Sequence, residues 1–275
     1  MTGRPEASPP RRSRERLSRG AAVRPQTLFL SRPRACKTAA FAAVSASLVA
    51  ASAALGQATA PPAAKADSEI NKPFVKPDVP AFVKRFETES REVYVQRKAI
   101  VEALGLKRGS SVADVGAGTG LFTRLMAAKV GPEGRVYAVD VAQEFLTHIA
   151  NDARRLGQTQ VRTVLGSQAT TNLPKDSIEL AFLCDVYHHL ENPERTLASI
   201  HRALKPEGTL VVVDFDRVKG KSSEFVHKHV RAEKAVFIKE IQAAGFVLDP
   251  VANPPGLKEN FFLRFRKAGG PAASD

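Results

Sequence analysis

The feature that most constrains this chain is a glycine-rich loop between an apolar run and a helical segment. Residues 111–115 (SVADV) are predicted to form a strand, residues 116–120 (GAGTG) a loop, and residues 121–130 a helix. Glycines at alternate positions let the backbone approach a ligand closely, because no Cβ intervenes. The helix that follows offers unpaired N–H groups, which suit an anionic group. The segment therefore predicts a ligand site at the end of this strand.

An acidic residue, Asp140, ends the next predicted strand. A carboxylate at this position can accept hydrogen bonds from both hydroxyls of a ribose. A dinucleotide site would have the spacing G-x-G-x-x-G, but here the last of those positions is Leu121, which is too large for the same close packing of helix against strand. The G-x-G-x-G spacing favours a different nucleoside cofactor and leaves an NAD(P)-dependent oxidoreductase as the alternative.

The body of the chain alternates strands and helices. Because helices separate most of the strands, we expect an α/β fold with a mostly parallel sheet covered on both faces. Ligands of such sheets bind beyond the carboxyl ends of the strands. The predicted strands are 111–115, 135–139, 160–165, 178–184, 209–215, 247–251 and 260–266, and the predicted helices are 80–104, 121–130, 142–156, 193–204 and 222–244.

Three motifs resemble those of class I S-adenosylmethionine-dependent methyltransferases, and the similarity runs from about residue 79 to residue 267. The motifs are VADVGAGTG, YAVD and LKPEGTLVVVDF. The sequence is most similar to the ubiquinone/menaquinone type of small-molecule methyltransferase. The resemblance implies a Rossmann-like, seven-stranded, mostly parallel sheet of order 3-2-1-4-5-7-6, with the last strand antiparallel and helices on both faces. It also implies S-adenosylmethionine as the cofactor.

The resemblance assigns cofactor contacts by position. The glycine loop would hold the methionine part, Asp140 the ribose, and Val141 the adenine ring. Many relatives have Gly-Asp-Ala after the third strand, whereas this chain has Gly166-Ser167-Gln168, so Ser167 or Gln168 would take the adenine contact. The cofactor-binding residues expected are Asp114, Gly116, Ala117, Gly118, Thr119, Gly120, Asp140, Val141, Ser167, Gln168 and Asp185.

The fourth predicted strand ends in a polar corner, Cys184-Asp185-Val186-Tyr187-His188-His189. Methyl transfer needs an aligned acceptor and, for a protic acceptor, a group that takes its proton. His188 is the expected base, since the ordinary pKa of histidine lies near neutrality. Asp185 would either orient a histidine or hold the ammonium of the methionine part. No metal site is expected, because adjacent histidines usually point apart and no distant ligand is evident.

Further residues are candidates for the substrate side or a lid. Tyr187 and Asp214 lie near the ends of the fourth and fifth strands, and His227 lies on the long helix that follows. Arg91 and Tyr94 lie on the first helix, which would cover the cofactor. The competing account of Arg91 is a surface pair with Glu87 at i,i+4.

The first sixty residues resemble an export signal. Ten of the 41 Lys and Arg residues and only two of the 28 acids lie there, followed by an uncharged apolar run, residues 38–55, and small residues. The net charge of +13 is thus concentrated outside the body, which gives no reason to expect nucleic acid as a partner. Two cysteines, Cys36 and Cys184, exclude a disulfide framework.

The resulting organisation is a leader (residues 1–60), a Pro/Ala/Lys-rich linker (61–78), a methyltransferase domain (79–268) and a flexible tail (269–275). Cleavage would make the protein periplasmic or secreted, with no stable membrane span. An uncleaved leader would leave it membrane-anchored or cytoplasmic. We expect a small-molecule acceptor of unidentified structure. The alternatives are the oxidoreductase named above and a non-catalytic S-adenosylmethionine-binding protein.

Overall fold

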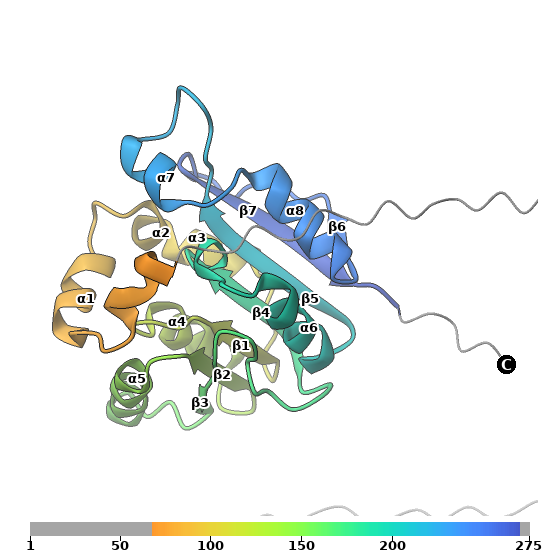
Figure 1. The fold of residues 1–275 in the computed structure, drawn as a ribbon. Helices are drawn as coiled ribbons and strands as arrows, with labels where there is room; N and C mark the ends of the chain where they lie inside the picture. The colour runs from red at the N-terminus through yellow and green to blue at the C-terminus, as the bar shows by residue number, and fades with distance from the viewer. Residues whose placement is uncertain (1–67, 270–275) are drawn as a thin grey trace, which may run out of the picture. The chain divides into compact units, whose positions relative to one another are not determined.

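Seven strands form one sheet in the computed structural model, which describes residues 68–269. The order is β3-β2-β1-β4-β5-β7-β6, and β7 runs antiparallel to both of its neighbours. Both features confirm the expected sheet (Figure 1). The strands are β1 Ser111–Val115, β2 Arg135–Asp140, β3 Val161–Leu165, β4 Ile178–Cys184, β5 Leu204–Phe215, β6 Phe246–Asp249 and β7 Asn260–Lys267.

Helices cover both faces of the sheet because its central strands are apolar on both sides. On one face, α3, α4 and α5 pack against residues such as Val112 and Phe182. On the other, α6, α7 and α8 pack against residues such as Ala113 and Leu183. The helices are η1 Ser68–Phe74, α1 Val79–Phe86, α2 Glu92–Val95, α3 Arg97–Ala103, α4 Leu121–Val130, α5 Gln143–Arg155, η2 Tyr187–His189, α6 Pro193–Ala203, α7 Glu224–His229 and α8 Lys234–Ala243.

The first predicted helix, residues 80–104, is three helices in the structure. The chain leaves α1 at Glu87 and turns through residues 88–90 before α2 and α3. Glu87 and Arg91 are not a surface pair, because Glu87 binds Arg124 of α4 and Arg91 binds Asp185 beyond β4. These two distant partners lie in different directions, and one continuous helix would not present both side chains to them.

The predicted helix 222–244 is also interrupted. Residues 230–233 separate α7 from α8, and Val230 and Ala232 are buried there. Arg231 forms a buried ion pair with Glu240 of α8. The turn allows the chain to bury this guanidinium against its partner, which outweighs the helical periodicity of the sequence.

Part of the predicted linker is ordered. Residues 68–74 form η1, and the buried Asn71 within it hydrogen-bonds to His189. The predicted leader and most of the predicted tail lie outside the described residues. Among the described residues, no helix has the length and apolarity needed to cross a membrane.

Candidate functional site

Asp140, at the end of β2, holds the glycine loop in place through a hydrogen bond to its backbone. Gly116, Gly118 and Gly120 have φ values of 75°, 52° and 77°, a left-handed backbone that favours glycine. The Gly118 N–H donates to Asp140 Oδ2 at 2.8 Å, and the Ala142 N–H donates to Oδ1 at 2.9 Å. Asp140 therefore joins the loop to the start of α5, while each of its oxygens keeps a lone pair for a further donor.

The two ends of the loop are packed differently. A Cβ at Gly116 would lie 2.5 Å from Val186 Cγ2, so the backbone there is packed against the η2 corner. At Gly118 such a Cβ would make only ordinary van der Waals contact with a ring carbon of Phe86, at 3.9 Å, so the end of α1 covers this part of the loop without pressing on it. The left-handed glycine backbone and the Asp140 carboxylate fit the polar groups of a nucleoside cofactor.

Asp114 lies beneath the loop rather than at its surface. Its side chain is buried, and Oδ2 accepts a hydrogen bond of 2.6 Å from Thr123 Oγ1. Burial raises the pKa of Asp114 from 3.8 to about 7, and the Thr123 bond opposes that rise. Asp114 therefore supports the junction of β1 with α4 from below.

The side expected to hold adenine is exposed. Val141 exposes 43% of its surface to solvent. Ser167 Oγ accepts from the Ala169 N–H at 3.3 Å, and the Gln168 carbonyl accepts from Thr196 Oγ1 at 3.3 Å. The loop after β3 is thus held by its own hydrogen bonds.

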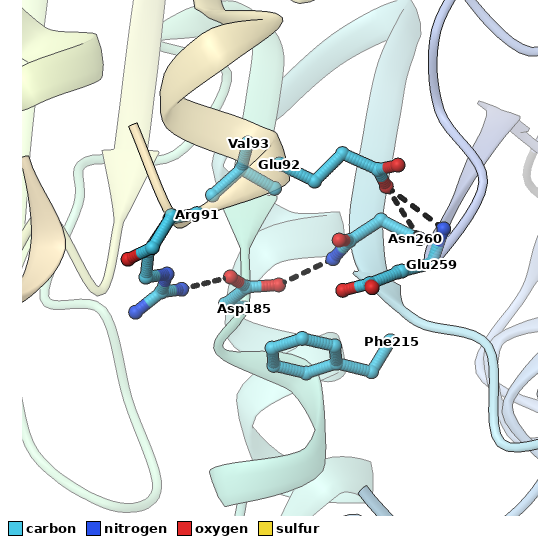
Figure 2. Close-up of a pocket in the computed structure, with 8 residues that line it drawn as sticks. Arg91, Glu92, Val93, Asp185, Phe215, Glu259 and Asn260 are labelled. Atoms are coloured by element: carbon cyan, nitrogen blue, oxygen red, sulfur yellow. Dashed lines mark hydrogen bonds and ion pairs between the residues drawn. The ribbon is translucent and has the colours of Figure 1, made fainter. Parts of the chain in front are cut away.

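Asp185 occupies the centre of the site with a left-handed backbone, φ 53°. Figure 2 shows its carboxylate between Arg91, with which it forms an ion pair, and Asn260, whose Nδ2 donates to Oδ1 at 2.7 Å. Burial raises the pKa of Asp185, and the Arg91 guanidinium opposes this. A cavity of about 140 Å³ adjoins them, walled by Phe215. A larger one, about 390 Å³, lies at the opposite edge of the sheet and contains none of the predicted site residues.

Glu92 of α2 forms another wall of the smaller cavity, the one beside Asp185. Its carboxylate accepts backbone N–H bonds from Lys258, Glu259 and Asn260, at 2.6, 2.9 and 2.9 Å. Figure 2 shows Glu92 beside Glu259 and Asn260. The start of β7 is therefore anchored to the helices that precede β1.

His188 is oriented by Asp214 and not, as one expectation had it, by Asp185. His188 Nδ1 lies 2.7 Å from Asp214 Oδ1, and the His188 backbone N–H donates to Oδ2 at 3.1 Å. Both side chains are almost completely buried. Because the carboxylate only accepts, the neutral ring carries its proton on Nδ1 and presents a lone pair at Nε2. That Nε2 is buried and has no hydrogen-bond partner among the described residues.

Two more histidines gather around His188. His189 and His229 have ring centroids 4.2 and 5.0 Å from that of His188, and 5.0 Å from each other. Burial and the neighbouring His188 together lower the pKa of His189 from 6.5 to about 2 and that of His229 from 6.5 to about 4. The fold thus brings three imidazoles together beyond the end of β4.

Three of the predicted substrate or lid residues lie elsewhere. Tyr187 is fully buried, and its hydroxyl donates to Glu240 at 3.1 Å, because the η2 turn directs it into the core beside Phe237. Tyr94 packs instead under the Arg97 guanidinium, 4.0 Å from the ring centroid. His227 is half-buried on α7 and is not part of the histidine group. Arg91 and Asp214 are at the site.

Sequence reasoning missed three residues of this region. Asn71 lies in the segment interpreted as a linker, Asn260 begins the last strand, and His229 lies two positions after His227 on the predicted helix 222–244. Each contacts the corner after β4 through pairing or packing between segments distant in the chain. The sequence around each of these residues gives no sign of such a contact, so only the fold reveals it.

Residues 113–212 of the chain match the family model described as "Methyltransferase domain". The seven-stranded order with antiparallel β7, the glycine loop after β1 and the acid after β2 occur together in this chain. These features define a domain of the class I S-adenosylmethionine-dependent methyltransferase type, as the sequence motifs indicated, and S-adenosylmethionine is its cofactor.

The comparisons refine this class without naming an acceptor. A SAM-dependent methyltransferase from Aquifex aeolicus is similar in structure, with a TM-score of 0.60 and 25% identity, covering 69% of this chain and 98% of that one. A ubiquinone/menaquinone biosynthesis C-methyltransferase of Hydrogenovibrio crunogenus is 29% identical over 126 residues, 44% of this chain and 48% of that protein. An uncharacterized 37.1 kDa protein of a Streptomyces fradiae transposon is 32% identical over 120 residues, 44% of this chain and 34% of that protein. The chain thus spans less than half the length of these curated relatives.

Proposed function

We propose that this protein transfers a methyl group from S-adenosylmethionine to a small-molecule acceptor. The observation that carries the proposal is the hydrogen bond from Gly118 to Asp140 in a glycine loop with a left-handed backbone, at the same sheet edge as Asp185. When bound, the cofactor supplies an electrophilic methyl group on a sulfonium sulfur. The antiparallel β7 argues against the oxidoreductase alternative, whose dinucleotide fold has the strand order 3-2-1-4-5-6.

Each residue of the proposed cofactor site has a separate task. The N–H groups of Gly116, Ala117, Gly118 and Gly120 already donate within the protein. The N–H groups of the first turn of α4 therefore face the methionine carboxylate, and Asp140 accepts from the ribose hydroxyls with its remaining lone pairs. Asp185 supplies negative charge near the methionine ammonium and the sulfonium. Phe86 and Arg91 come from the segment before β1 and cover the loop, which keeps water from the reacting atoms.

The acceptor would lie between the η2 corner and α7. Phe215 and His188 line this region, and Phe225 is exposed beside them on α7. A neutral or weakly acidic molecule is favoured, because burying a second cation beside a sulfonium is costly. His188 Nε2 presents the lone pair that would accept the proton of such a molecule, with the ring held by Asp214.

Calorimetry with S-adenosylhomocysteine tests the cofactor site. Asp140→Asn should weaken binding about 10- to 100-fold, since a hydrogen bond to a charged group contributes about 1.5–3 kcal/mol. Asp249→Asn on β6, remote from the loop, is the matched control and should bind as the wild type does. Equal affinity in all three proteins, or no binding to the wild type, would contradict the proposal.

Turnover with a panel of thiols, phenols and carbon acids, using methyl-labelled cofactor, tests the transfer itself. If His188 takes the proton, His188→Ala should lower kcat by roughly 10²–10⁴ with little change in cofactor affinity. If His188 only shapes the pocket, KM should rise instead. Binding of the cofactor without transfer to any acceptor would favour the non-catalytic alternative.

A further inference from the structure

The histidine group at the acceptor side has more organisation than a single proton acceptor needs. One ring nitrogen each of His188, His189 and His229 lies within 4.8 Å of the other two. These residues come from two segments, η2 and the end of α7, which the fold brings together. Sequence analysis predicted no metal site because it found no ligand beyond the adjacent pair, and His229 supplies that ligand.

Hydrogen bonds fix the two adjacent rings in the same tautomer. His188 Nδ1 donates to Asp214, as described above. His189 Nδ1 lies 2.9 Å from Asn71 Oδ1. The amide of Asn71 donates through Nδ2 to the His189 carbonyl and to Glu191, which fixes its Oδ1 as the acceptor of the Nδ1 proton. Both histidines therefore present an unprotonated Nε2.

This is the arrangement in which proteins prepare histidine ligands. A metal-bound histidine usually donates its second ring nitrogen to a carboxylate, a carbonyl or water, which sets the tautomer and the ring orientation. The buried His188 Nε2, which lacks a partner among the described residues, is otherwise a costly feature of the core.

We propose that His188, His189 and His229 bind one divalent transition-metal ion, Zn²⁺ or an ion of similar preference, and leave one coordination position open. Three histidines with an open fourth position are typical of catalytic zinc. Tetrahedral zinc at 2.0–2.1 Å from each nitrogen holds the nitrogens roughly 3.4 Å apart, so the group contracts modestly on binding. The Asp214 carboxylate beside His188 supplies a negative charge that favours a bound cation.

The open position gives the metal a purpose in the proposed methyl transfer, and this part of the inference rests on that function. Phe215 packs against His188 and also walls the cavity beside Asp185, so the metal would lie next to the reacting region. With its Nε2 on the metal, His188 no longer takes the proton: a thiol or hydroxyl acceptor releases its proton to solvent and binds the ion as its anion. The acceptor class is therefore a small molecule whose acceptor atom is a ligating sulfur or oxygen.

Metal analysis of the full chain tests the site. After chelation and dialysis, the wild type titrated with ZnCl₂ should bind one zinc per chain, and Co²⁺ should give the visible bands of a four-coordinate ion. His229→Ala and His229→Gln should each lose this binding at least 100-fold, as judged by competition with a chromophoric chelator. His227→Gln, two positions away on α7, and His148→Ala on α5 should bind like the wild type. Circular dichroism checks that every variant is folded.

The outcomes separate this inference from the proposed function. No zinc binding by the wild type, or equal binding by the folded His229 variants, overturns the metal site. If S-adenosylhomocysteine still binds in that case, the proposed function stands and His188 acts without a metal. If zinc binds as expected and the cofactor does not, the metal site stands and the proposed function fails.

Discussion

Arg91 and Asp185 form an ion pair across 94 positions of the chain. Arg91 immediately precedes α2, and Asp185 follows β4, so the pair ties the first helices to the carboxyl edge of the sheet. The Asn260 amide donates to the other oxygen of Asp185. Because burial disfavours the Asp185 carboxylate, its charge depends on both partners.

A double-mutant cycle with Arg91→Gln and Asp185→Asn should reveal this dependence. Asparagine tolerates the left-handed backbone of position 185, so the change tests charge rather than strain. We expect a coupling energy of about 1–3 kcal/mol in urea unfolding. The exposed pair Lys228–Glu224 is the matched control and should couple by less than about 0.5 kcal/mol. Similar coupling in both cycles would mean that the Arg91 pair is an ordinary surface contact.

Asp114 should make the protein less stable as the pH rises. Its pKa is about 7 in the folded state and about 3.9 in an unfolded chain, so between these values the folded state holds a proton that the unfolded state has released. The free energy of unfolding should be greatest below pH 4, fall on the order of 2–4 kcal/mol by pH 7, and then level off as far as Asp114 contributes.

Asp114→Asn isolates that contribution. Asparagine cannot ionise and still accepts the hydrogen bond from Thr123, so it mimics the protonated carboxyl. The stability of the variant relative to the wild type should increase from pH 4 to pH 7 in denaturant titrations. A difference that is constant over this range would show that Asp114 is ionised in the folded protein.

Gly116→Ala should destabilise the fold more than Gly157→Ala does. Both glycines have a left-handed backbone, with φ of 75° and 67°, so each substitution carries the same strain of about 1–2 kcal/mol. Only at Gly116 would the new methyl group meet a neighbour, Val186, whereas nothing lies within 4 Å at Gly157. We expect an excess of about 1–3 kcal/mol in thermal unfolding. Equal losses would mean that Val186 moves aside freely.

Glu240→Gln should cost about 3–5 kcal/mol of unfolding free energy, because it leaves the buried Arg231 guanidinium without its partner. Tyr187 would also lose a charged acceptor. Glu233→Gln, at an exposed position just before α8, should change stability by no more than about 0.5 kcal/mol. A loss of less than 1 kcal/mol for Glu240→Gln, measured in urea, would show that water reaches Arg231.

The sequence predicted regular elements best where periodicity and packing agree. The bounds of β1, β4 and α4 were predicted without error, since each is an apolar run or helix ended by a loop or glycine. The breaks at residues 87–91 and 230–233 were not predicted. Each break allows a charged side chain, Arg91 or Arg231, to reach a partner elsewhere in the structure. Local periodicity contains no information about such partners.

The functional site also contains parts that the sequence predicts and parts that it does not. The glycine loop and Asp140 follow directly from their positions after β1 and β2. The partner of His188 does not, because Asp185 is nearer in sequence than Asp214, but only Asp214 lies beside the ring. The pairing of β4 with β5 places Cys184 opposite Val213, so the residue after Val213 comes level with the η2 corner.

The insertion of β7 between β5 and β6 has a consequence for synthesis on the ribosome. Strands β1 to β5 are complete by residue 215. These five strands, with the glycine loop, can therefore assemble while β6 and β7 are still being translated. The outer edge of β5 stays unpaired until β7, the last of the described strands, has emerged. Asn260 begins that strand and binds Asp185. The Asp185 carboxylate therefore acquires its full set of partners only after β7 has been translated, so a chain that stops before residue 260 would retain the glycine loop but lack the Asn260 contact.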